Sequence, residues 1–87
     1  MITKNYEGKF VLYYHDKQHI KDAYQWFDDM RNEPPCEIAN LLKDLYGYEE
    51  IIICMAYTWF VRNIPLKQMN FNDIAKETTF INPFMYK

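Results

Sequence analysis

The chain has 87 residues, of which ten are basic, twelve are acidic and 18% are aromatic. This length predicts one domain covering residues 1–87, and the nearly balanced charge disfavours general DNA or RNA binding, which usually leaves a basic surface. Two cysteines are too few for a disulfide framework or a structural zinc site, so free thiols and a cytoplasmic location are expected.

The first predicted elements are a strand and a helix. Residues 9–14, KFVLYY, combine β-branched and aromatic side chains after Gly8, which predicts a strand. A helix is predicted over residues 16–31, with Asp16 as its N-cap. The apolar residues of this helix, which recur at the spacing of one helical face, are Ile20, Ala23, Tyr24, Phe27 and Met30.

A second helix is predicted over residues 35–46. Proline is tolerated in a first helical turn, where its missing N–H is not needed, and Gly47 is suited to end the helix with a positive φ. The apolar stripe of this helix, which predicts its core side chains, consists of Ile38, Leu41, Leu42 and Leu45. Residues 16–31 and 35–46 are therefore expected to form an antiparallel two-helix hairpin.

Residues 49–62 allow two interpretations. As a helix the segment is apolar on all sides, which predicts a central buried helix, whereas its three consecutive isoleucines favour a strand. Its longest apolar run, residues 51–61, has 11 residues and is too short to cross a membrane, which takes about 20. The C-terminal segment TTFINPF is expected to be extended and to pair beside residues 9–14, with Pro83 restricting it to an edge.

The predicted fold class is therefore α+β and mainly helical. It consists of the two-helix hairpin, a third buried helix or strand, and a small antiparallel sheet formed by the N- and C-terminal segments. Length favours the helical alternative for residues 49–62, because the segment is longer than a usual strand.

The sequence offers little that could support catalysis or hold a metal. His15 and His19 are four residues apart, but a helix beginning at Asp16 would leave His15 outside it, and zinc needs three or four ligands. The chain has no serine and no glycine-rich loop, and the acidic residues near Cys36 oppose formation of its thiolate. We therefore expect no enzyme activity, no metal and no cofactor.

The middle of the chain is strongly acidic. Residues 28–50 contain seven acidic and two basic side chains, a net charge of −5, and they follow a tryptophan. Tyrosine and tryptophan are favoured at protein interfaces, and acidic side chains attract basic surfaces. The predicted partner-binding residues are Trp26, Asp28, Asp29, Glu33 and Glu37.

These features favour a small non-enzymatic protein-binding module that inhibits a larger protein, with a basic surface on the partner and no membrane involved. The profile is similar to that of small phage and mobile-element proteins that bind and block a host protein, among them anti-CRISPR and other anti-defence proteins. This similarity is one of overall profile and rests on no motif. Two alternatives are a structural homo-oligomer or accessory subunit of a larger assembly, and a single-stranded nucleic-acid-binding protein that stacks bases on its aromatic rings.

Overall fold

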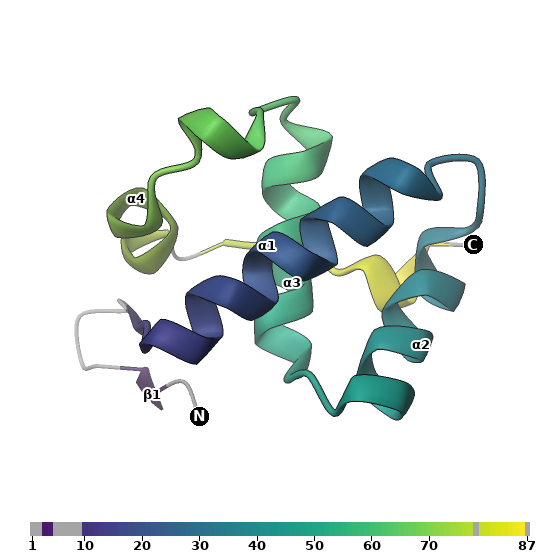
Figure 1. Ribbon diagram of the computed structural model, residues 1–87, viewed down its shortest axis with the longest axis horizontal. Helices are drawn as coiled ribbons and strands as arrows, with labels where there is room; N and C mark the ends of the chain where they lie inside the picture. The colour runs from purple at the N-terminus through teal and green to yellow at the C-terminus, as the bar shows by residue number, and fades with distance from the viewer. Residues whose placement is uncertain (1–2, 5–9, 78, 87) are drawn as a thin grey trace.

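The computed structural model describes residues 3–4, 10–77 and 79–86. Within them the α-helices are α1 (Tyr14–Asp29), α2 (Pro35–Tyr46), α3 (Glu50–Val61) and α4 (Phe71–Lys76) (Figure 1). Two short 3-10 helices, η1 (Leu66–Gln68) and η2 (Pro83–Met85), lie before and after α4. None of the helices in this part of the chain is long and apolar enough to cross a membrane.

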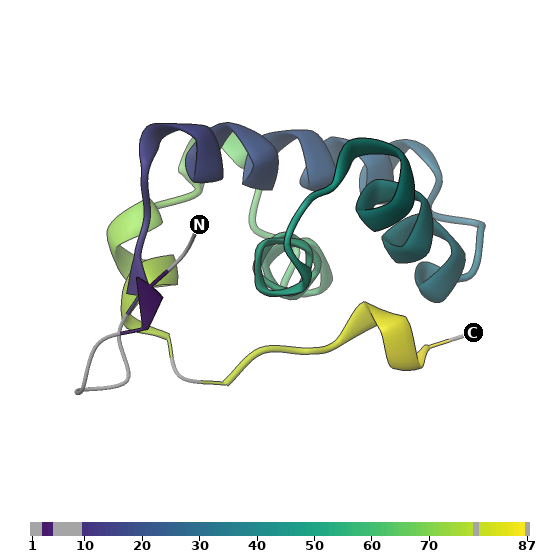
Figure 2. The ribbon, with the colours of Figure 1, turned by 90° about the horizontal axis from the view of Figure 1, so that it is seen from below.

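Helix α3 lies at the centre of the molecule. Figure 2 shows it almost end-on, between α1 on one side and the C-terminal segment on the other. Its buried residues are distributed around the whole helix and are Ile52, Ile53, Cys54, Met55, Ala56, Thr58 and Trp59. A helix that is apolar on all sides is stable only when it is covered on all sides. Of the two interpretations of residues 49–62, the helix is the one observed.

Helix α1 covers α3 with one apolar face. Figure 1 shows the two helices crossing, and the residues of α1 that the contact buries include Ile20, Ala23 and Phe27. Tyr24 and Met30 flank this face and are partly buried. The predicted apolar face of the first helix is therefore confirmed.

The predicted α+β fold class is wrong, because the described residues form a helical fold without a sheet layer. The strands β1 (Thr3–Lys4) and β2 (Phe10–Val11) pair antiparallel, but each has only two residues. In the described part of the chain the C-terminal segment does not join them. Of the strand predicted at 9–14, residues 10–11 form β2, Tyr14 already belongs to α1, and residue 9 lies outside the described residues.

The C-terminal segment packs against helices instead. The backbone N–H of Ile81 donates to the hydroxyl oxygen of Thr58 at 2.8 Å, and this hydroxyl donates to the carbonyl oxygen of Cys54 at 2.7 Å. Further along, the backbone N–H of Cys36 in α2 donates to the carbonyl oxygen of Tyr86 at 2.8 Å. Backbone groups that are buried must find hydrogen-bond partners, and α2 and α3 supply them where a neighbouring strand was predicted.

Helix α1 begins earlier and ends earlier than predicted. Tyr13 is its N-cap, and the predicted cap Asp16 is the third helical residue. The buried carboxylate of Asp16 accepts a hydrogen bond from the backbone N–H of Tyr13 at 3.0 Å, so it satisfies the helix end from within the first turn. His15 and His19 therefore both lie on the helix, which ends at Asp29.

Candidate functional site

Helix α2 has one face in the core and an apolar stripe outside it. Ile38, Ala39 and Leu42 are buried, whereas Leu41 is 43% exposed and Leu45 is 67% exposed. The prediction that Leu41 and Leu45 enter the core is therefore wrong. The neighbours α1, α3 and η2 cover only the side of α2 that carries Ile38 and Leu42. Leu41 and Leu45 are four residues apart and share a different side.

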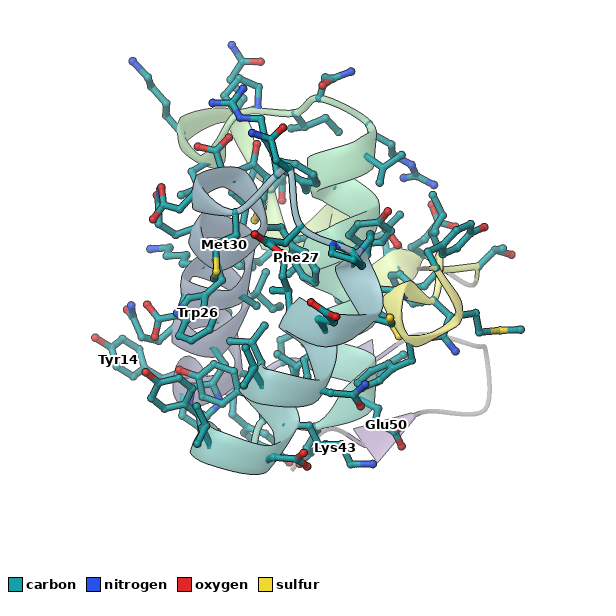
Figure 3. The ribbon with its side chains drawn as sticks, turned by 90° about the vertical axis from the view of Figure 1, so that its right-hand side faces the viewer. Tyr14, Trp26, Phe27, Met30, Lys43 and Glu50 are labelled. Atoms are coloured by element: carbon teal, nitrogen blue, oxygen red, sulfur yellow. The ribbon has the colours of Figure 1, made fainter. Side chains whose placement is uncertain are left out.

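The uncovered side of α2 also bears acidic groups. A shallow hollow of about 370 Å³ is lined by Glu37, Asn40, Leu41 and Asp44. Figure 3 looks onto α2 and shows Lys43 and Glu50 near its lower edge, where they form an ion pair at 3.5 Å. We call Glu37, Asn40, Leu41, Asp44 and Leu45 the α2 outer surface. It combines exposed leucines with two carboxylates.

A second hollow lies where α1 meets the turn between α2 and α3. Its volume is about 340 Å³, and it is lined by Asp22, Gln25, Trp26, Asp29, Tyr46 and Tyr48. Three of these residues are aromatic and two are carboxylates. We call this group the aromatic–acidic hollow.

The rings of the aromatic–acidic hollow contact one another. The centroids of Trp26 and Tyr46 are 5.5 Å apart with an interplanar angle of 83°, and those of Tyr46 and Tyr48 are 5.6 Å apart at 30°. Tyr48 also stacks on His19, with centroids 4.1 Å apart. Burial first, and then the hydrogen bond that its hydroxyl donates to Asp22 at 3.1 Å, raise the pKa of Tyr48 to about 12.

Three of the residues predicted to bind a partner line these two hollows. Trp26 and Asp29 lie in the aromatic–acidic hollow, and Glu37 lies on the α2 outer surface. Figure 3 shows Trp26 and Phe27 leaving α1 in different directions, Phe27 toward the core and Trp26 toward the surface. The ring of Trp26 is partly buried against the core.

The other two predicted residues lie apart from the hollows. Asp28 is on another side of α1, near Tyr24. Burial first, and then the charge of Asp28, raise the pKa of Tyr24. The hydroxyl of Tyr24 donates to the carbonyl oxygen of Ile64 at 2.7 Å, which places this region beside the end of α3. Glu33 is exposed in the turn between α1 and α2.

The other four lining residues of the hollow were not predicted from the sequence, namely Asp22, Gln25, Tyr46 and Tyr48. A usable signal was present in the tripeptide Tyr46–Gly47–Tyr48. Gly47 has φ 69°, in the left-handed region, and its N–H donates to the carbonyl oxygen of Lys43 at 2.9 Å. Ending a helix in this way reverses the chain, and here the two flanking tyrosine rings stack on each other.

The two histidines lie closer together than predicted. Their ring centroids are 5.7 Å apart, and the Nε2 atom of His15 lies 3.2 Å from a carboxylate oxygen of Asp16. The predicted separation of the histidines by a cap at Asp16 is therefore wrong. Among the described residues, no group of three or more His, Cys, Asp or Glu side chains could hold a metal ion. The expectation that the chain binds no metal remains a prediction.

The cysteines differ in their surroundings. Burial first, and then the nearby charge of Glu50, raise the pKa of the Cys54 thiol to about 11, so this thiol is protonated at neutral pH. Cys36 is partly exposed in the first turn of α2. A protonated, buried thiol is a poor nucleophile. The absence of enzyme activity is likewise still a prediction.

Comparisons of this chain with protein families, with curated proteins and with solved structures found no match.

Proposed function

We propose that this chain is a non-enzymatic module that binds another protein through the α2 outer surface and thereby inhibits it. The observation that supports this most directly is the exposure of Leu41 and Leu45 on a helix whose other side fills the core. Leucine is a costly residue to leave in water, since burying one stabilises by about 1.5–3 kcal/mol. Two leucines on one uncovered face favour a partner that buries them.

The charges around these leucines favour a partner with a basic surface. Glu37 and Asp44 line the same hollow as Leu41, and both are exposed. Interfaces commonly have an apolar centre and a polar rim, and rim charges of one sign steer association with the opposite sign. The α2 outer surface has this arrangement on a single helix.

The two alternative functions fit this surface less well. A symmetric homodimer through α2 would bring Glu37 and Asp44 of two copies toward each other, because a two-fold interface uses the same patch twice. Like charges in such an arrangement oppose association. Single-stranded nucleic acid would place phosphates near the same carboxylates, whereas nucleic-acid-binding grooves are cationic.

A binding measurement with matched variants tests the proposal. The tagged chain captures its partner from the native host, the partner is identified and purified, and the dissociation constant is measured. Leu41→Gln together with Leu45→Gln should weaken binding by at least about tenfold, as loss of a central apolar contact does. Val61→Gln is the control. Val61 is as exposed as Leu41, at 42% against 43%, but it is the last residue of α3 and does not belong to the α2 outer surface.

Three outcomes would count against the proposal. Equal binding by the leucine variant and the wild type would show that the α2 outer surface is not the contact surface. A wild-type dimer in light scattering that the leucine variant converts to a monomer would support the homo-oligomer instead. If the purified partner keeps its full activity when saturated with the chain, the inhibitory part of the proposal is wrong.

A further inference from the structure

The aromatic–acidic hollow is organised before any ligand arrives. The Tyr48 ring is held on one face by His19, 4.1 Å away between centroids, and its hydroxyl is held by Asp22. The side-chain amide of Gln25 donates to a carboxylate oxygen of Asp29 at 2.8 Å. A site whose side chains are already fixed loses less conformational entropy on binding.

The charge of this hollow has no cationic counterpart within the described part of the chain. Its two carboxylates, Asp22 and Asp29, accept hydrogen bonds from neutral donors, namely Gln18, Gln25 and Tyr48. The ion pairs that the structure shows involve other carboxylates, those of Asp16, Glu50 and Glu77. Neither a lysine nor an arginine lines the hollow. A ligand that is complementary to this hollow therefore carries a positive charge.

The rings narrow the choice of cation. Trp26 and Tyr46 meet nearly at right angles, and Tyr48 lies roughly parallel to Tyr46. Aromatic faces attract cations, and a planar guanidinium can stack on a ring while its N–H groups donate to a carboxylate at the ring's edge. An ammonium is compact and strongly hydrated, so it gains less from stacking.

We propose that the aromatic–acidic hollow receives an arginine side chain of the partner protein, stacked on its rings and paired with Asp29. This inference rests on the proposed protein-binding function and adds the chemistry of one contact. In this arrangement Trp26 and Tyr46 provide the stacking surfaces. Asp29 is the better ion-pair acceptor because Asp22 already accepts from Gln18 and Tyr48.

The probe is a single amino acid, so the test does not depend on the partner. Two-dimensional NMR of the labelled chain follows a titration with N-acetyl-arginine methylamide, with the neutral citrulline analogue as the uncharged control. We expect shifts in the indole N–H of Trp26 and in the amides of Tyr46 and Tyr48 with arginine only. The indole of Trp59, which is buried in the core, should stay unchanged as an internal reference.

Two variants at neighbouring positions distinguish binding at the hollow from general electrostatic attraction to an acidic protein. Asp29→Asn removes the charge at the hollow, whereas Asp28→Asn removes the same charge on another side of α1. Because charge-assisted hydrogen bonds are about twice as strong as neutral ones, we expect Asp29→Asn to weaken arginine binding by about fivefold or more. Asp28→Asn should leave binding within about twofold, as expected for a screened surface charge.

Each result supports or overturns the inference. No shift at the hollow, shifts equal to those with citrulline, or equal losses in the two aspartate variants would each overturn it. Equal or tighter binding of N-acetyl-lysine methylamide would make the guanidinium assignment wrong. If the leucine variant of α2 abolishes partner binding while Asp29→Asn leaves it unchanged, the protein-binding function stands and the arginine contact fails. If neither variant weakens partner binding, both fail.

Discussion

Leu41 and Leu42 are adjacent in the chain but lie in opposite environments, because one faces outward from α2 and the other fills the core. Leu42 is fully buried and Leu41 is 43% exposed. We predict that Leu42→Ala lowers the free energy of unfolding by about 2–5 kcal/mol, the range for a buried leucine that leaves a cavity. Leu41→Ala should change it by no more than about 0.5 kcal/mol, as is usual for surface positions. Urea unfolding of both variants measures this, and equal losses would contradict the placement of α2.

The periodicity of α2 could identify its apolar residues but not how many of them the fold would cover. Ile38, Leu41, Leu42 and Leu45 match one helical face in sequence. Which part of that face is buried depends on where α1, α3 and η2 lie, and this is a property of the tertiary structure. The residue-level prediction was therefore right for Ile38 and Leu42 and wrong for Leu41 and Leu45.

Gly47 provides a second test at the level of one residue. Its φ of 69° is unfavourable for a side chain, although an added Cβ would meet no atom within 4 Å. Gly47→Ala should therefore lower the free energy of unfolding by about 1–2 kcal/mol, because of backbone conformation and not of a steric clash. Gly47→Asn should lose less, because asparagine visits this region more readily. Thermal unfolding of the two variants gives the order, and alanine as stable as glycine would contradict the left-handed helix end.

Among the elements, helices α1 and α2 were predictable from local sequence, and the path of the C-terminal segment was not. Periodicity and end signals lie within each helix, as Gly47 and the first helical face illustrate. The path of residues 79–86 depends on a hydrogen bond to Thr58 in α3, more than twenty residues away in sequence. A mid-helix threonine is usually assigned to bonding within its own helix, so its second role could not be inferred. The predicted terminal sheet failed for this reason.

Substitutions of Thr58 test whether its hydroxyl holds the C-terminal segment against α3. We predict that Thr58→Val lowers the free energy of unfolding by about 1–3 kcal/mol, because the Ile81 N–H loses its acceptor while the side-chain shape is nearly kept. Thr58→Ser keeps the hydroxyl and loses one methyl group, which should cost about 0.8 kcal/mol. Hydrogen exchange at Ile81 should accelerate in the valine variant alone. If exchange there is the same in both variants, the bond does not hold the segment.

In the whole molecule, the central position of α3 follows from its composition, but the arrangement around it does not. A helix without a polar face must be surrounded, and in Figure 2 the coverings come from parts of the chain far apart in sequence. The candidate site, too, could be predicted from the sequence only in part. Trp26 and Asp29 were predicted from α1, whereas Tyr46 and Tyr48 reach the same hollow only through packing of the α2–α3 turn.

Stability at alkaline pH is a property of the whole fold to which the buried Cys54 and the partly buried Tyr48 should both contribute. The pKa of Cys54 is raised from 9.0 to about 11, chiefly by burial, and the pKa of Tyr48 is raised from 10.0 to about 12, also chiefly by burial. In both cases the folded state favours the neutral, protonated form. A group with a raised folded pKa contributes stability that is complete below its unfolded pKa and is lost as the pH rises through the folded pKa.

We therefore predict that the melting temperature falls between pH 9 and about 11 as Cys54 ionises. The fall due to Tyr48 should begin near pH 10 and continue to about 12. Melting curves of wild type, Cys54→Ala and Cys36→Ser over this range isolate the first contribution. Cys54→Ala has a cavity and should melt lower at neutral pH, but its slope between pH 9 and 10 should be shallower than that of wild type. Cys36→Ser, which removes the partly exposed thiol, should keep the wild-type slope. Equal slopes in the wild type and Cys54→Ala would show that the Cys54 thiol does not destabilise the fold when it ionises.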